Sequence, residues 1–240
     1  MIKYITVFTG AGRKKKRRTM VNLYGMNIKE LPDARDHPAV LQRISRNRRS
    51  RVMEYLQADD RKRCLGAGIL LADILPLYGE NPEKITLGPM GKPEAEKIYF
   101  NISHSGDWVI CAVSGEIVGC DIERIGQEPD GVAQRFFHPN EAAYLQRFQG
   151  EVRNEMFFRL WTWKESYMKM TGEGAHLSLR DFEILPVGEQ IRVRRGQEAL
   201  SCRIMEYNLI GYKVSVCARE TAFADCITHV YYDRAREDNF

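Results

Sequence analysis

The 240-residue sequence lacks the usual marks of a secreted, zinc-binding or membrane-spanning protein. Its six cysteines form no C-x-x-C pair, and no histidine lies at metal-site spacing from them, which argues against a zinc site or a disulfide framework. The sequence has no run of about 18 apolar residues, and residues 1–8 alternate like a strand instead of forming the apolar stretch of a signal peptide. We therefore expect buried thiols, no membrane partner and a cytoplasmic location.

The charge is moderately positive, with a formal net charge of +4 and basic clusters at 13–18 and 43–63. Such a surface suits an anionic partner, which is a nucleic acid, a phosphorylated cofactor or an acidic protein. Recognition of single-stranded nucleic acid usually needs aromatic side chains between the basic ones, and the run from Arg13 to Arg18 contains none. We therefore expect no nucleic-acid partner.

A pair of carboxylates marks one predicted strand. The segment 117–123 is rich in β-branched and apolar residues, and Asp121 and Glu123, two residues apart, project from the same face of a strand. Two buried carboxylates on one face repel each other, and a hard divalent ion is the usual compensation. The ordinary alternative is a solvated edge strand.

A third acidic side chain lies on a predicted helix some forty residues later. Trp161, Glu165 and Lys169 are spaced at i, i+4 and i+8, on one side of a helix. Glu165 is a candidate third oxygen ligand, and Lys169 is a candidate for holding a phosphate oxygen, because Mg²⁺ is commonly bound by a few carboxylates together with phosphate. The alternative is a surface pair of opposite charges.

The order of predicted elements indicates an α+β fold. Helical spacing covers 38–77 with a break near 58–60, a hairpin covers 97–113, and a long helix at 151–170 is ended by Gly172. Helices followed by strands occur at 45–123 and again at 140–218. We therefore predict two similar α+β halves, residues 1–118 and 119–240, in a pseudo-twofold arrangement with the active site between them.

Further candidate residues precede the carboxylate pair. Arg48 and Arg51 at i, i+3, with Arg63 on the next helix, form either a phosphate clamp or an ordinary charged face. His104 at a strand end, between Ser103 and Ser105, is either a structural hydrogen-bonding group or part of a loop that approaches a phosphate or base closely.

Taken together, these segments resemble the 4′-phosphopantetheinyl transferase superfamily, in particular its larger, monomeric members with two halves. The resemblance rests on order and spacing over roughly residues 40–232. The matching segments are Phe100-Asn101-Ile102-Ser103-His104-Ser105-Gly106, Gly119-Cys120-Asp121-Ile122-Glu123, Arg135-Phe136-Phe137 with Glu141, and Trp161-Thr162-Trp163-Lys164-Glu165-Ser166 with Lys169 and Gly172.

The resemblance implies a Mg²⁺-dependent holo-[carrier protein] synthase, which transfers the 4′-phosphopantetheine arm of coenzyme A to a serine of an apo acyl or peptidyl carrier protein and releases adenosine 3′,5′-bisphosphate. Such enzymes activate carrier proteins of peptide, polyketide and fatty-acid synthesis. By the family pattern, Asp121, Glu123 and Glu165 hold Mg²⁺, and Lys169 contacts a phosphate. The same pattern places Ser103 and His104 near the nucleotide end of coenzyme A and Lys92 in the adenine pocket. It places Arg48, Arg51 and Arg63 at the 3′-phosphate. Cys64 departs from the pattern where relatives can offer a hydroxyl group, and the run 13–18 has no counterpart.

The chemistry leaves some roles open. We expect Glu165 to take the proton of the attacking serine, with Glu141 or a water at the metal as rivals. Carrier proteins are generally acidic around the modified serine, so we expect them to dock on the loop 126–138, which ends at Phe136 and Phe137. The alternative for the whole chain is a catalytically silent coenzyme A binding or scaffold protein of the same fold, against which the intact acidic triad argues.

Overall fold

The computed structural model describes residues 20–219 and 222–232. The predicted first strand at 1–9, the basic run from Arg13 to Arg18 and the polar tail from Arg234 lie outside the described residues.

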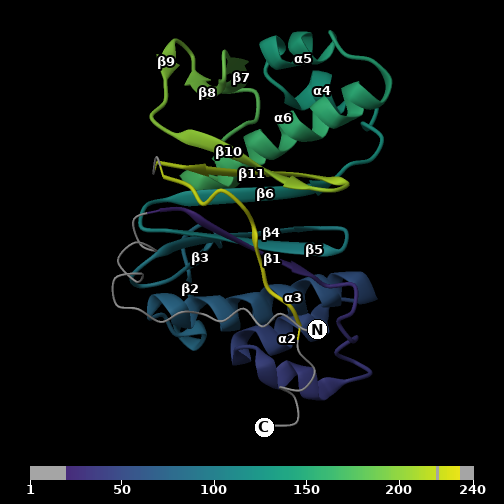
Figure 1. Cartoon of the computed structure of the whole chain (residues 1–240), viewed down its shortest axis with the longest axis vertical. Coiled ribbons are helices and arrows are strands. Elements are labelled where there is room, and N and C mark those ends of the chain that lie inside the picture. Colours follow the sequence, from purple (N-terminus) through teal and green to yellow (C-terminus); the bar gives the residue numbers. More distant parts are fainter. Residues whose placement is uncertain (1–19, 220–221, 233–240) are drawn as a thin grey trace.

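The first half of the chain forms a sheet covered by helices. β1 pairs with β5 and β5 with β4, all antiparallel, while β12 adds to β1 in parallel. α3 packs on β5 and β1, and α2 packs on α3 (Figure 1). The elements are β1 (Asn22–Asn27), α2 (Arg46–Glu54), α3 (Ala58–Ile74), β4 (Tyr99–Ser105), β5 (Trp108–Ser114) and β12 (Thr228–His229), with a small hairpin of β2 (Thr86–Leu87) and β3 (Pro93–Glu94) and the short 3₁₀ helices η1 (Pro38–Arg43), η2 (Leu75–Tyr78) and η3 (Pro82–Lys84).

The following part of the chain, from β6 to β11, also places a helix on a sheet. A three-stranded antiparallel sheet of order β10-β11-β6 carries the long helix α6 on its outer face, so that Figure 1 shows two sheets stacked between helical layers. Beyond α6 lie the short helices α4 and α5 and the small sheet of β7, β8 and β9 (Figure 1). The elements are β6 (Val118–Arg124), α4 (Val132–Phe136), α5 (Pro139–Leu145), α6 (Gly150–Thr171), η4 (Gly174–His176), β7 (Glu183–Val187), β8 (Gln190–Arg195), β9 (Glu198–Ala199), β10 (Arg203–Leu209) and β11 (Tyr212–Ala218).

The two sheets bury apolar side chains against each other. Leu23 and Ile110 of the first sheet belong to the same buried cluster as Cys120, Ile122 and Val216 of the second. Alternating apolar residues on these strands thus face a shared core, which removes them from water and fixes the relative position of the sheets. The packing of the two sheets thereby holds β4 of the first sheet next to β6 of the second.

The predicted α+β class is confirmed, and most elements match. The helix predicted at 151–170 is α6, and Gly172, with φ +72, ends it in the left-handed conformation that glycine adopts easily. The predicted helical run 38–77 is divided into four shorter helices, with its main break at 55–57 instead of 58–60.

The division into halves at residue 119 stays a prediction, as does their pseudo-twofold relation. β12, near the end of the described chain, pairs with β1 of the first sheet, so the last described segment returns to the first half. Among the helices of the described residues, none has both the length and the apolar composition needed to cross a bilayer.

Candidate active site

A cavity of about 310 Å³ lies where β4, β6 and α6 meet. It brings together six of the side chains singled out from the sequence, among them all three predicted metal-binding carboxylates. The lining residues are Ile102, Ser103, His104, Asp121, Glu123, Trp161, Glu165 and Lys169.

A glycine at the start of β6 allows this convergence. A Cβ atom added to Gly119 would overlap the backbone carbonyl of Ser166 and the backbone nitrogen of Met170. The absence of a side chain at Gly119 therefore lets the last turns of α6 lie against the β6 backbone. This close approach brings Lys169 within reach of Asp121.

Asp121 is the most buried carboxylate of the cavity, with 2% of the residue exposed. Its Oδ1 accepts hydrogen bonds from Ser103 Oγ at 2.8 Å and from Lys169 Nζ at 2.5 Å, while its Oδ2 is buried and has no hydrogen-bond partner. Burial raises the pKa of Asp121, and Lys169 opposes this shift. Desolvation disfavours the charge of Lys169, yet Asp121 holds the pKa of Lys169 above its ordinary value.

The other two carboxylates are also short of positive charge. Burial raises the pKa of Glu123, and the neighbouring charge of Asp121 adds to the increase. Burial likewise raises the pKa of Glu165, with Lys169 lowering it and Asp121 raising it further. Three carboxylates thus share one lysine, and a cation in the cavity would relieve their repulsion.

The donor set fits a hard divalent ion, although the ligands are not gathered around one point. In the described part of the chain, no group of three His, Cys, Asp or Glu side chains is arranged so that it could hold a metal ion. The unpartnered Asp121 Oδ2 and the oxygen donors of Glu123 and Glu165 are nevertheless of the type that Mg²⁺ takes.

The three predicted phosphate-binding arginines do not line this cavity. Arg63 is nearest: it pairs with Asp60 at 2.7 Å, donates to the carbonyl of Gly106 at 3.3 Å, and adds to the effect of desolvation in lowering the pKa of His104. Arg48 donates to the carbonyl of Cys64 at 3.5 Å, and burial lowers its pKa. Arg51 is exposed on α2.

Lys92 lies in a neighbouring pocket of about 350 Å³ that shares Glu165 and Lys169 with the cavity. Its Nζ donates to the carbonyl of Val118 at 3.1 Å and to that of Lys169 at 2.6 Å. Lys92 therefore fastens the segment between β2 and β3 to the start of β6 and the end of α6. Its ammonium group is already engaged, while its stem remains available to line the pocket.

Glu141, a rival for the general base, lies elsewhere. It is fully buried, and its carboxylate accepts hydrogen bonds from Lys164 Nζ at 2.7 Å, from the Ile184 nitrogen at 2.6 Å and from the His138 nitrogen at 2.9 Å. It does not line the cavity, so the suggestion that it takes the serine proton is wrong. Lys164 and Glu165 are adjacent in the sequence but project in different directions from α6: Lys164 is buried against Glu141, whereas Glu165 lines the cavity.

The pair Phe136-Phe137 is also divided between two environments. Phe137 is fully buried, whereas Phe136 is 39% exposed and lies under the guanidinium of Arg135 at 5.2 Å. The expected docking loop 126–138 therefore ends in one exposed ring, that of Phe136, and one buried ring, that of Phe137.

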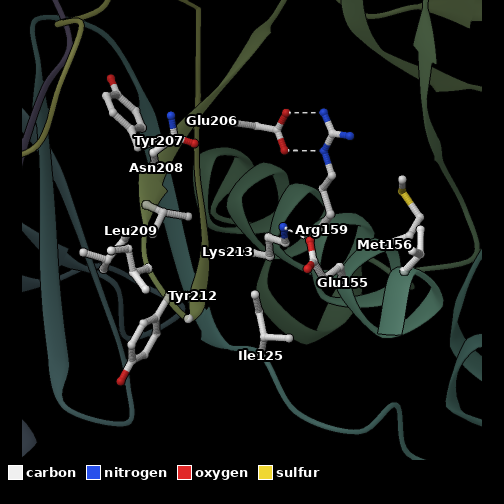
Figure 2. A pocket seen from close by; sticks show the side chains of 14 residues that line it. Ile125, Glu155, Met156, Arg159, Glu206, Tyr207, Asn208, Leu209, Tyr212 and Lys213 are labelled. Atoms are coloured by element: carbon white, nitrogen blue, oxygen red, sulfur yellow. Dashed lines mark hydrogen bonds and ion pairs between the residues drawn. The ribbon is translucent and has the colours of Figure 1, made fainter. Parts of the chain in front are cut away.

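A separate groove of about 550 Å³ lies between α6 and the β10–β11 hairpin (Figure 2). It contains none of the predicted site residues. Its cations are engaged, because Arg159 pairs with Glu206 at 2.6 Å and Lys213 pairs with Glu155 at 2.8 Å. The groove therefore lacks the excess charge of the smaller cavity.

An α+β fold with three carboxylates and a lysine around one cavity is typical of enzymes that act on phosphorylated ligands with the help of a divalent ion. The family model of the 4′-phosphopantetheinyl transferase superfamily matches residues 117–217, which include β6 and α6. A Bacillus subtilis protein named 4′-phosphopantetheinyl transferase is 30% identical over 89% of this chain and 99% of its own length. The gsp 4′-phosphopantetheinyl transferase of Aneurinibacillus migulanus is 34% identical over 73% of this chain and 76% of its own length. The chain belongs to the 4′-phosphopantetheinyl transferase superfamily.

Proposed function

We propose that this chain transfers the 4′-phosphopantetheine moiety of coenzyme A to a serine of an apo carrier protein and releases adenosine 3′,5′-bisphosphate. Membership of the superfamily supports this activity. The observation that carries it for this chain is the shared cavity of Asp121, Glu123, Glu165 and Lys169. The same observation disfavours the silent-scaffold alternative, since a scaffold gains nothing from buried carboxylates that repel each other.

Asp121, Glu123 and Glu165 would hold Mg²⁺, which, when bound, neutralises charge on the pyrophosphate of coenzyme A. Lys169 would hold a phosphate oxygen, and the neighbouring Asp121 carboxylate keeps its ammonium charged for this task despite its burial. Glu165 is the proposed acceptor of the serine proton, because it lines the cavity and its raised pKa makes it a better base than a solvated glutamate.

Other side chains would place the rest of coenzyme A. Ser103 and His104 line the cavity and would lie near the nucleotide end, and the pocket of Lys92 would take the adenine. Arg48, Arg51 and Arg63 would meet the 3′-phosphate. Of these, the exposed Arg51 has the most freedom to reach a ligand, because Arg48 and Arg63 already donate to carbonyl groups of the chain.

The carrier protein would dock along residues 126–138, where the half-exposed ring of Phe136 offers an apolar contact beside Arg135. The positive net charge of the chain favours encounter with an acidic partner. We further propose that the enzyme acts as a cytoplasmic monomer.

Mass spectrometry tests the activity directly. Incubation with an apo carrier protein, coenzyme A and Mg²⁺ should add the phosphopantetheine arm, and Asp121→Ala and Glu165→Ala should each lower turnover by about 10²-fold or more. Glu155→Ala, on the same helix as Glu165 but exposed and paired with Lys213, is the matched control and should keep wild-type turnover. Wild-type turnover in both cavity variants would show that the metal assignment is wrong, and coenzyme A binding without transfer by the wild type would favour the scaffold.

A further inference from the structure

Side chains of one strand join the two sheets beside the cavity. β4 and β6 lie next to each other but belong to different sheets, so no backbone ladder links them. Asn101, Ser103 and Ser105, at alternate positions of β4, each hydrogen-bond to β6 instead: their partners are the Cys120 nitrogen at 2.9 Å, Asp121 Oδ1 at 2.8 Å and Glu123 Oε2 at 2.9 Å. Because alternate residues of a strand share a face, these bonds form one row across the junction.

Ser105 stands at the end of this row, and its hydroxyl proton has a fixed direction. Ser105 Oγ accepts a hydrogen bond from the backbone nitrogen of Arg124 at 3.1 Å. The same oxygen donates its proton to Glu123 Oε2 at 2.9 Å. Since the backbone donor occupies one lone pair of the hydroxyl, the proton is directed toward Glu123.

The hydrogen bond from Ser105 matters more for the position of the Glu123 carboxylate than the hydrogen bond from Ser103 does for that of Asp121. Asp121 is additionally paired with Lys169, whereas no lysine or arginine within residues 20–219 and 222–232 forms an ion pair with Glu123. A glutamate has three rotatable side-chain bonds, and its carboxylate must be held if it is to stay beside Asp121 against their mutual repulsion.

We propose that Ser105 is a positioning residue, which orients the Glu123 carboxylate for binding of a divalent cation. This inference rests on the proposed function, because it takes Glu123 to be a cation ligand. Ser105 itself does not line the cavity. Its loss should therefore weaken cation binding without changing how coenzyme A is held.

The test uses Mn²⁺ as the probe ion, with free Mn²⁺ measured by electron paramagnetic resonance in titrations of the full-length chain. Ser105→Ala should raise the Kd for Mn²⁺ about 10-fold, the usual effect of removing a group that orients a metal ligand. Ser105→Thr keeps the hydroxyl and should stay within about 2-fold of the wild type. In the transfer assay, Ser105→Ala should raise the KM for Mg²⁺ while leaving the KM for coenzyme A unchanged at saturating Mg²⁺.

Ser114→Ala is the matched control. Ser114 is a buried serine near the other end of the β4–β5 hairpin, and its hydroxyl accepts a hydrogen bond from the Glu116 nitrogen at 3.1 Å. This variant removes the same atoms and should leave the Kd for Mn²⁺ as it is. If Ser105→Ala does not fold, Ser105→Cys, which has a similar shape but donates weakly, takes its place.

Three outcomes would overturn the inference. They are wild-type Mn²⁺ affinity in Ser105→Ala, a loss of affinity in Ser105→Thr equal to that in Ser105→Ala, and a loss in Ser114→Ala of the same size. The proposed function is judged separately by Asp121→Ala in the same titration. If Asp121→Ala weakens Mn²⁺ binding and Ser105→Ala does not, only the inference about Ser105 is overturned. If Asp121→Ala leaves Mn²⁺ binding unchanged, both the metal assignment and the inference are overturned.

Discussion

Lys164 and Glu141 form an ion pair that is fully enclosed by the protein, with both side chains 0% exposed. Lys164 Nζ donates to the Glu141 carboxylate at 2.7 Å and to the carbonyl of Phe182 at 2.9 Å, and it lies 4.0 Å from the centre of the Phe182 ring. Burial lowers the pKa of Lys164 to about 8, against the opposing effect of Glu141. The pair joins α5, α6 and the residues just before β7.

Lys164→Met would remove the positive partner and leave the Glu141 carboxylate inside the protein. Glu141 would keep its bonds from the Ile184 and His138 nitrogens, but those donors carry no full charge. Breaking a buried ion pair in this way costs about 3–5 kcal/mol of the free energy of unfolding, out of the roughly 5–15 kcal/mol typical of a folded domain. The double variant Glu141→Gln with Lys164→Met removes the orphaned charge and should recover about 2 kcal/mol.

Urea unfolding at pH 7, followed by tryptophan fluorescence, measures both effects. Lys213→Met is the control, since its partner Glu155 has a side chain that is 56% exposed and the loss should be below about 1 kcal/mol. If Lys164→Met costs no more than Lys213→Met, or if the double variant is no more stable than Lys164→Met alone, the buried pair does not have the energetic role argued for it.

Three further predictions concern the backbone, acid stability and coenzyme A. Gly119→Ala should cost about 3 kcal/mol or more of the free energy of unfolding in urea and should lower transfer activity, because the added Cβ pushes α6 away from β6. The control Gly126→Ala, whose Cβ would meet only a ring atom at 3.8 Å, should cost under about 0.5 kcal/mol. Equal losses in the two variants would contradict the packing argument. Hydrogen bonding to Arg61 holds the pKa of Asp33 at about 2, below its ordinary 3.8. The contribution of the Asp33–Arg61 pair to stability is therefore complete above pH 3.8 and is lost as the pH falls toward 2. The melting temperature of Asp33→Asn should vary less with pH in this window than that of the wild type, and parallel curves would contradict the role of the pair. Arg51→Ala should raise the KM for coenzyme A about 10-fold but barely change that for dephospho-coenzyme A, and an equal rise for both would remove its role at the 3′-phosphate.

Much of the site was predictable because its parts are local. Helical spacing placed Trp161, Glu165 and Lys169 on one face of α6, and strand alternation placed Asp121 and Glu123 on one face of β6. Gly119 could be recognised as a point of close approach only once α6 was seen against it.

The assignments that failed or stayed open all depend on distant contacts. Glu141 pairs with Lys164 of α6 and does not line the cavity. The ammonium group of Lys92 donates hydrogen bonds to two backbone carbonyl groups. The role of Ser105 was hidden, since nothing in a single strand shows which side chain of a neighbouring sheet it will meet. Such pairings are decided by the packing of whole elements.

The sequence by itself determined most of the helices and strands and which side chains share a face, because these follow from backbone sterics and from spacings of two to four residues. The tertiary structure alone decided that β4, β6 and α6 enclose one cavity, that Lys169 lies against Asp121, and that Glu141 lies outside the cavity, paired with Lys164. The physical reason is that burying the apolar faces of two sheets and their helices sets the distances between residues that are distant in the chain, and no local pattern encodes those distances.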